Sequence, residues 1–210
     1  MSKVSNSIVV GGPIAVGKSS LVGALPFIPV QELDPNDELQ LLLIEKMYEG
    51  DPIAPQIFQL DMLLTRFDKY KKMANDPEAH VFDRSIFEDK YFAKNLLKNY
   101  PNIWNYYHSI WKDKVEELLK EIGLPKHYLL LTCDWKTFKE RVFERNRLPE
   151  IENFEANESY FKDMIDNYEK FMKDIFKEYG IEYTVLNTNN LGKLEVIDEA
   201  KKILKEKGFL

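Results

Sequence analysis

The hydrophobic residues of this chain fall into short continuous runs, separated by longer stretches in which apolar positions recur at helical spacing. The short runs are apolar nearly throughout, as is typical of parallel strands that are covered on both faces. They predict strands at residues 7–10, 27–31, 80–82, 128–132 and 183–186. The stretches between them predict helices at roughly 17–25, 36–49, 52–75, 85–99, 102–122, 135–146, 157–179 and 193–207. Alternating strands and helices indicate an α/β fold, a doubly wound parallel sheet with right-handed crossovers.

The connection between the second and third predicted strands is long and contains two amphipathic helices, broken at Gly50 and Pro52. In the first of them, "QLLLIEKMY" is apolar on more than one face, which indicates burial against a neighbouring helix or against another subunit. Two aromatic stretches, "NYPNIWNYYHSIW" and "YFKDMIDNYEKFM", are interpreted as core stripes. Because no repeat, low-complexity tract or linker interrupts the pattern, we expect residues 1–210 to form one domain.

Composition and charge exclude several classes of function. The net charge of −6 argues against a protein that binds duplex DNA by neutralising phosphates, so no nucleic-acid partner is expected. The single cysteine, Cys133, excludes an intrachain disulfide framework and a zinc site of several cysteines. No run approaches the ~18 apolar residues of a membrane span, and the start of the chain lacks a secretory signal. We therefore expect a cytoplasmic protein without a membrane partner.

The first predicted strand runs into a glycine-rich loop that matches G-x-x-x-x-G-K-[ST] at every fixed position, and a helix follows. Such a loop curls so that successive backbone N–H groups form a cradle for phosphates at a helix N-terminus. Lys18 is expected to reach the β- and γ-phosphates, and the Ser19 hydroxyl to bind Mg²⁺. The sequence thus predicts a nucleoside triphosphate site made of Gly12, Pro13, Ile14, Ala15, Val16, Gly17, Lys18, Ser19 and Ser20.

Charged residues follow the other strands at the edge where ligands bind in open parallel sheets. Glu32 follows the second strand, and Asp83 and Arg84 follow the third. The helix after the fourth strand carries three further arginines, Arg141, Arg145 and Arg147. Carboxylates that face a triphosphate, together with several cations, are the components of a phosphoryl-transfer enzyme. No N-K-x-D or D-x-x-G element of a GTPase accompanies them.

The chain resembles the deoxynucleoside kinases in five motifs. In chain order, these are the phosphate loop, "QE", "MYEGDP…FQLDMLLTR", "DRSIFED" and "ERVFERNRLPE". The resemblance implies a P-loop kinase with a five-stranded parallel sheet flanked by helices and an arginine-bearing lid at about 141–156. It implies ATP-dependent 5′-phosphorylation of a deoxynucleoside for nucleotide salvage, with Mg²⁺ as cofactor. It also implies a homodimer formed through the helices that flank the long crossover.

The resemblance further implies roles for individual residues. Glu32 resembles the general base, Arg84 its partner, and Asp83 an acid that helps to hold the Mg²⁺ shell with Ser19. Lys18 and Arg145 are expected to act on the transferring phosphate, and Arg141 and Arg147 to bind ATP beside them. The substrate side is implied to consist of Glu32, Tyr48, Gln59, Arg66, Arg84, Asp89 and Glu150, in which Tyr48 and Glu150 bind the 3′-hydroxyl and Gln59 reads the base edge.

Base preference is predicted from Arg66 and Asp89, whose spacings match a pair found in family members that accept purine deoxynucleosides or deoxycytidine. We expect deoxyadenosine or deoxyguanosine as substrate, deoxycytidine as a further candidate and thymidine as a poor one. Other interpretations stay open at this stage. Asp34, which precedes a proline as the family's glutamate does, competes with Glu32 as base, and Arg66–Asp89 could be a surface salt bridge.

Two of the implied substrate residues also have an interpretation without a role in binding: Tyr48 could be a core aromatic and Gln59 a solvated helix residue. For the whole chain, a (deoxy)nucleoside monophosphate kinase and a catalytically silent nucleotide-binding module are the alternative functions. A monophosphate kinase would need extra cations for the acceptor's own phosphate, and region 36–62 offers only Lys46.

Overall fold

A parallel sheet forms the centre of the molecule in a computed structural model, which describes residues 4–210 except for the side chain of Pro149. In this described part, the sheet has five strands in the order β2-β3-β1-β4-β5, and all neighbouring strands are parallel. The strands are β1 (Ser7–Gly11), β2 (Ile28–Val30), β3 (His80–Asp83), β4 (His127–Thr132) and β5 (Tyr183–Asn187). The predicted α/β fold with a five-stranded parallel sheet is confirmed.

The three central strands are buried along their whole length, whereas β2 and β5 at the edges are partly exposed. This burial explains why the central strands appear in the sequence as continuous apolar runs. The register pairs Val10 with Asp83 and Gly11 with Leu130, so β1, β3 and β4 end at the same edge. The residues that follow these strands therefore come together there.

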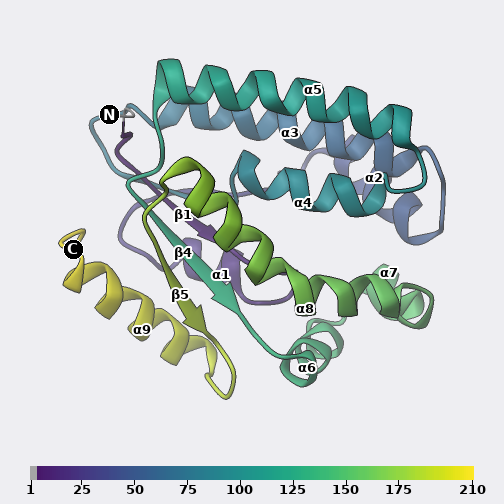
Figure 1. Ribbon diagram of the computed structural model, residues 1–210. Helices are drawn as coiled ribbons and strands as arrows, with labels where there is room; N and C mark the ends of the chain where they lie inside the picture. The colour runs from purple at the N-terminus through teal and green to yellow at the C-terminus, as the bar shows by residue number, and fades with distance from the viewer. Residues whose placement is uncertain (1–3) are drawn as a thin grey trace.

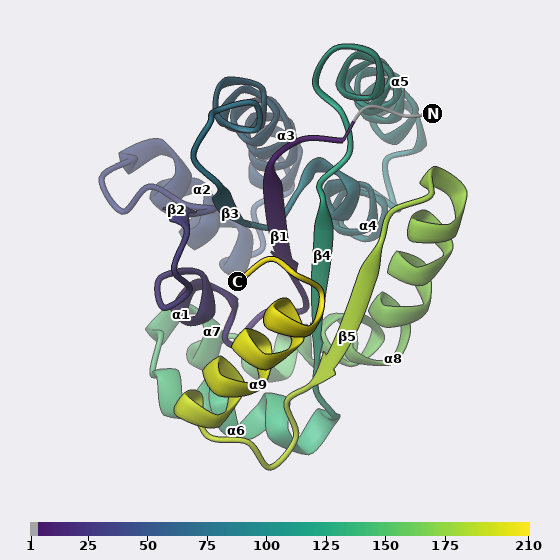
Figure 2. The same cartoon turned by 90° about the vertical axis from the view of Figure 1, so that its left-hand side faces the viewer.

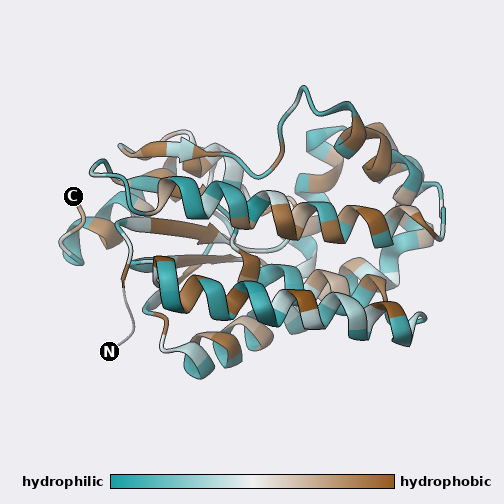
Figure 3. Cartoon of the chain, turned by 90° about the horizontal axis from the view of Figure 1, so that it is seen from above, coloured by the Kyte–Doolittle hydropathy of each residue, from teal (hydrophilic) through white to brown (hydrophobic). Residues whose placement is uncertain are grey.

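Helices cover both faces of the sheet (Figures 1 and 2). On one face lie α1 (Lys18–Val22) and α9 (Lys193–Glu206). On the other side are α3 (Ala54–Met73), α4 (Ile86–Leu96), α5 (Pro101–Glu117) and α8 (Phe154–Tyr179), while α2 (Glu38–Tyr48) packs against α3. The helices α6 (Trp135–Arg145) and α7 (Leu148–Glu152) lie beyond the carboxyl ends of the strands. In Figure 3 the strands carry hydrophobic colours, whereas the helices show alternating hydrophilic and hydrophobic bands.

Side-chain caps set the start of the helices that carry candidate residues. The Ser85 hydroxyl accepts a hydrogen bond from the Phe87 N–H at the start of α4, and Asp134 accepts one from the Thr137 N–H at the start of α6. Asp37 caps α2 in the same way through the Gln40 N–H. Each cap satisfies a backbone donor that the helix itself leaves unpaired.

The predicted elements are largely confirmed, with two differences in the helices. Between the helices predicted at 135–146 and 157–179, Asn146 adopts a left-handed conformation with φ 52°, and a short helix that was not predicted, α7, follows. Asparagine tolerates this conformation better than most residues, so α6 ends there. The helix predicted at 102–122 is α5 followed by a π-helical turn, Leu118–Ile122. Across the described residues, no helix is both long and apolar enough to span a membrane.

Candidate active site

The glycine-rich loop wraps around the ammonium group of Lys18. Gly17 has φ 99°, a conformation that side chains disfavour, and it turns the chain into the first residue of α1. Lys18 is buried, and its Nζ donates to the carbonyl oxygen of Pro13 at 2.7 Å. Burial lowers the pKa of Lys18 to about 8, and the nearby charge of Arg84 acts in the same direction. A phosphate group inside the loop would restore the preference of Lys18 for its charged form.

Asp83 at the end of β3 faces the start of α1. The Ser19 hydroxyl donates to Asp83 Oδ2 at 2.5 Å, whereas Asp83 Oδ1 is buried and has no hydrogen-bond partner. Burial raises the pKa of Asp83 in spite of the opposing charge of Lys18. A hydroxyl and one carboxylate beside a triphosphate suit Mg²⁺, which takes one or two protein carboxylates plus phosphate oxygens. The described residues contain no group of three or more His, Cys, Asp or Glu that could hold a metal by itself.

Glu32, which follows β2, lies between two arginines. Arg84 Nε donates to Glu32 Oε2 at 3.0 Å, and Arg66 Nη2 donates to Oε1 at 2.8 Å. Burial by itself would raise the pKa of Glu32, but the charges of Arg84, Arg66 and Lys18 outweigh it and lower the pKa. The carboxylate is therefore ionised at neutral pH, and with 24% of its side chain exposed it stays accessible. The geometry suits a proton acceptor.

Asp34 has a different place. It is exposed, and its Oδ1 accepts hydrogen bonds from the backbone N–H of Asn36 at 2.9 Å and from the Asn36 side chain at 3.2 Å. This is the arrangement of an Asx turn, which shapes the loop after β2. Of the two carboxylates that the sequence left open as the base, Glu32 is the one that faces Arg84.

Arg66 and Asp89 form a buried ion pair between α3 and α4, in which Arg66 Nη1 donates to Asp89 Oδ1. Their exposed fractions are 6% and 2%, so the interpretation as a surface salt bridge is wrong. Arg66 Nε and Asp89 Oδ2 are buried without hydrogen-bond partners. Buried polar atoms are nearly always paired, so these two unpaired atoms leave hydrogen-bonding capacity that a ligand could use.

Gln59 lies on the same buried face of α3 as Arg66, two helical turns earlier. It is 4% exposed, so the interpretation as a solvated residue is also wrong. Its amide carries a donor and an acceptor, which makes it suited to the edge of a nucleobase.

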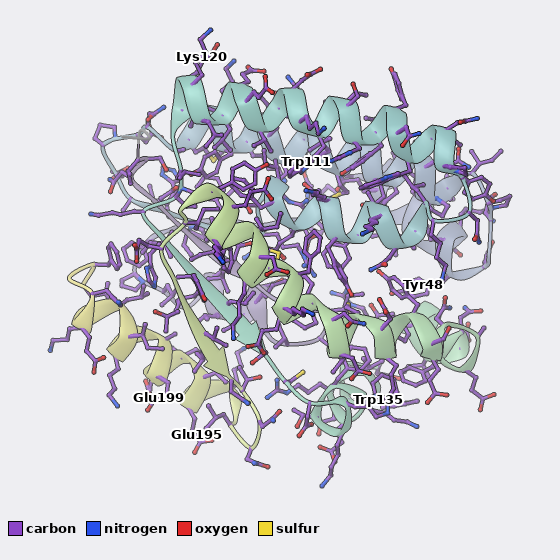
Figure 4. The ribbon with its side chains drawn as sticks, in the orientation of Figure 1. Tyr48, Trp111, Lys120, Trp135, Glu195 and Glu199 are labelled. Carbon is purple, nitrogen blue, oxygen red and sulfur yellow. The ribbon has the colours of Figure 1, made fainter. Side chains whose placement is uncertain are left out.

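The predicted 3′-hydroxyl residues are brought together across α2 and α7. Burial and the adjacent Glu150 carboxylate raise the pKa of the Tyr48 hydroxyl. Arg145 Nη2 donates to Glu150 Oε2, and Arg147 Nη1 lies 3.8 Å from Oε1. Figure 4 shows Tyr48 at the end of α2 near α7 and α8. The segment 141–156 thus contacts the long crossover at the acceptor side.

Arg141 lies apart from the other two arginines of this segment. Its guanidinium donates to Thr188 Oγ1 at 2.7 Å and to the carbonyl oxygens of Thr188 and Leu191 at 2.8 and 3.2 Å. Arg141 also lines a cavity of about 250 Å³ between the phosphate loop and α9. The other lining residues include Val16, Gly17, Ser20, Leu191, Val196 and Ile197. This places Arg141 and Ser20 at the cavity beside the phosphate loop.

Comparison with known proteins decides the family. The model of the family described as deoxynucleoside kinase matches residues 8–207. The chain belongs to the deoxynucleoside kinase family. It is 38% identical, over 99% of its length, to an uncharacterized protein of Mycoplasma pneumoniae, of which 93% is covered. It is also 28% identical, over 96% of its length, to 93% of a deoxyguanosine kinase of Lactobacillus johnsonii.

Solved structures with the same fold include two of a deoxyadenosine kinase from M. mycoides. The one with bound dCTP has a TM-score of 0.75 at 22% identity, and the one with bound dATP has 0.72 at 23% identity. Each match covers 95% of this chain and 99% of the other. The family makes this chain a nucleotide-binding kinase that phosphorylates nucleosides, and the structures confirm its P-loop kinase fold.

Sequence reasoning did not identify one group of buried residues that contacts the beginning of the phosphate loop, namely Glu88, Tyr128 and Tyr168. Glu88 is 0% exposed, and both tyrosine hydroxyls donate to its carboxylate. Tyr168 belongs to a stretch interpreted as a core stripe, which is incomplete because its hydroxyl is part of a polar network. The available signal was an acid four residues after Arg84, one helical turn away.

We expect Glu32→Gln to keep the fold and ATP binding but to lower kcat by ~10²-fold or more, because general-base catalysis contributes 10²–10⁴. Asp34→Asn is the matched control and should stay close to the unmodified protein. Steady-state transfer of labelled phosphate from ATP to a deoxynucleoside measures both. A large loss in Asp34→Asn with a small one in Glu32→Gln would reverse the assignment.

Proposed function

We propose that this kinase transfers the γ-phosphate of ATP to the 5′-hydroxyl of a purine deoxynucleoside, deoxyadenosine or deoxyguanosine, in nucleotide salvage. Deoxycytidine is a further candidate, and Mg²⁺ accompanies the ATP. The observation that carries the proposal is the buried Arg66–Asp89 ion pair. Its arginine also donates to Glu32, and its Nε and Oδ2 atoms have no hydrogen-bond partner. The similarity to a deoxyguanosine kinase and the shared fold with a deoxyadenosine kinase support a purine substrate.

In the proposed reaction, Glu32 removes the proton of the 5′-hydroxyl while that oxygen bonds to the γ-phosphorus. The bond from the γ-phosphorus to the bridging oxygen breaks, and ADP leaves with the electron pair. Lys18 and Arg145 offset the negative charge that spreads over the phosphoryl oxygens. Arg84 holds Glu32 in its ionised form. Mg²⁺, held by Ser19 and Asp83 together with phosphate oxygens, would supply charge neutralisation and alignment.

In this proposal, the polar side chains beside the base determine which nucleobase is preferred. Gln59 offers a donor and an acceptor to the base edge, and Arg66 with Asp89 offers the same to an exocyclic amine, a carbonyl oxygen or N7. A thymine methyl group would instead meet a desolvated charge pair that it cannot bond, a mismatch of about 1–3 kcal/mol. Tyr48 and Glu150 would bind the 3′-hydroxyl and so hold the deoxyribose while segment 141–156 covers it.

The acceptor region favours a nucleoside over a monophosphate. Lys46, the cation of region 36–62, is on the surface and pairs with Glu49 at 2.6 Å. An acceptor phosphate would need further cations, since a buried phosphate without them is strongly disfavoured. Arg66 and Arg84 are already paired with carboxylates. This supports the deoxynucleoside reading over a monophosphate kinase.

The double variant Arg66→Met/Asp89→Ala should change base preference. Because Arg66 also bonds Glu32, we expect kcat to fall for every substrate, so the informative quantity is the ratio of kcat/KM between deoxyadenosine and thymidine. That ratio should fall roughly tenfold or more, the equivalent of the 1.4 kcal/mol that lies within the expected mismatch. Glu32→Gln is the control that slows all substrates without changing the ratio. An unchanged ratio, or thymidine as the best substrate of the unmodified enzyme, would refute the purine assignment.

The proposed homodimer rests on apolar side chains that are about half exposed. They are Leu39, Leu41 and Leu42 of α2 and, around the start of α3, Ile53 and Ile57. A patch of this kind is typical of an interaction surface. We expect light scattering at micromolar concentration to give twice the chain mass of 24.7 kDa. Leu39→Asp/Leu42→Asp should give the single-chain mass, and Leu194→Asp, on the exposed side of α9, should not. A monomeric unmodified protein would remove this part of the proposal.

A further inference from the structure

Glu88 is a completely buried carboxylate in the first turn of α4. Arg84 Nη1 donates to its Oε2 at 2.6 Å, and the hydroxyls of Tyr128 and Tyr168 donate to its two oxygens. Burial, with the Glu88 charge added, holds the pKa of both tyrosines well above the usual value, so both remain donors. These three donors come from β4, from α8 and from the turn after β3. They provide the pairing that a buried charge requires.

The same network contacts the beginning of the phosphate loop. The backbone N–H of Gly12 donates to the Tyr168 hydroxyl at 3.1 Å and lies 3.5 Å from Glu88 Oε2. A Cβ atom on Gly11 would come within 2.6 Å of Glu88 Oε1 and 2.4 Å of Tyr128 Cε1. Only glycine allows this close approach, so the beginning of the phosphate loop packs directly against Glu88 and Tyr128.

Arg84 needs such support because its backbone is strained. Its φ of 69° is in the left-handed region, which a residue with a long side chain adopts only when its surroundings impose it. Glu32 binds the guanidinium at Nε, Glu88 binds it at Nη1, and the Phe92 ring lies 4.4 Å from its centre. Glu88 therefore fixes the end of Arg84 that faces away from the proposed base.

We propose that Glu88 is a positioning residue, which together with Tyr168 holds acceptor-site Arg84 at a fixed distance from Gly12 of the phosphate loop. Its kinetic consequence rests on the proposed phosphate transfer, whereas its consequence for ATP binding rests on the contacts of the loop alone. Glu88 acts through Arg84 and Tyr168 rather than on a substrate. The arrangement would keep Arg84, on the acceptor side, at a constant distance from the phosphate loop.

Two tyrosine variants separate positioning from simple packing. Tyr168→Phe and Tyr128→Phe each remove one buried hydroxyl bonded to Glu88, but only the Tyr168 hydroxyl accepts from Gly12. With titration calorimetry of ATP and Mg²⁺, we expect Tyr168→Phe to weaken binding by about 3- to 10-fold, as for one lost hydrogen bond. Tyr128→Phe should change it by less than about 2-fold. Equal effects of the two variants would overturn the link to the loop.

A double-mutant cycle tests the action through Arg84. We expect Glu88→Gln to lower kcat by roughly 10- to 100-fold in the unmodified background and to add nothing in an Arg84→Gln background, because coupled residues are not additive. Losses that multiply would overturn the proposal, since a purely structural role acts equally in both backgrounds. Thermal unfolding checks that the variants are folded. If Glu88→Gln does not fold, the calorimetric result for Tyr168→Phe decides the proposal.

The two proposals fail in different ways. An unmodified protein that binds ATP but phosphorylates no deoxynucleoside would contradict the proposed function, and the calorimetric comparison would still decide the role of Glu88. An active unmodified enzyme with equal tyrosine variants or multiplying losses would contradict the role of Glu88 alone.

Discussion

The guanidinium of Arg84 is 4% exposed and lies between two carboxylates, Glu32 after β2 and Glu88 on α4. An unpaired charge at this depth would be strongly unfavourable, whereas a charge held by two acids is tolerable. Although burial lowers it, the pKa of Arg84 stays well above its usual value because of these acids. Of these two acids, Glu32 remains accessible at the proposed acceptor site and Glu88 anchors Arg84 to the interior.

The sheet register makes the pairing possible. Val10 is opposite Asp83, so the phosphate loop and the turn with Arg84 leave the sheet at adjacent points. The Arg84 N–H still donates to the Val10 carbonyl at 3.0 Å, which ties the strained residue to the strand that enters the loop. The carboxyl ends of parallel strands lie at one edge of the sheet, and here that edge brings Arg84 and the phosphate loop together.

The sequence was most informative where one local pattern decides the structure. Continuous apolar runs located the strands because both faces of the sheet are covered, and the fixed glycines of the loop located the turn before α1. The family resemblance also placed Tyr48 near Glu150, although α2 and α7 are far apart in the chain.

Contacts that depend on the tertiary path were not predictable in this way. Arg141 is predicted to bind ATP, and that stays a prediction, whereas its hydrogen bonds to the carbonyls after β5 are encoded by no local pattern. Glu88 is in the first turn of a helix, where an acid usually stabilises the helix N-terminus from the surface. Its burial depends on Tyr128 and Tyr168, which lie 40 and 80 residues away in the sequence.

The site combines a closed polar network with atoms that are left open. Glu88 accepts hydrogen bonds from Arg84, Tyr128 and Tyr168, and such buried networks rigidify their surroundings when they are satisfied. Asp83 Oδ1, Arg66 Nε and Asp89 Oδ2 are buried and unpaired, and they belong to the proposed metal and base positions. Leaving a buried polar atom unpaired is unfavourable by about 1–3 kcal/mol, and a ligand that pairs it removes this penalty. Under the proposed function, ligands that pair these three atoms would therefore be favoured over ligands that leave them unpaired.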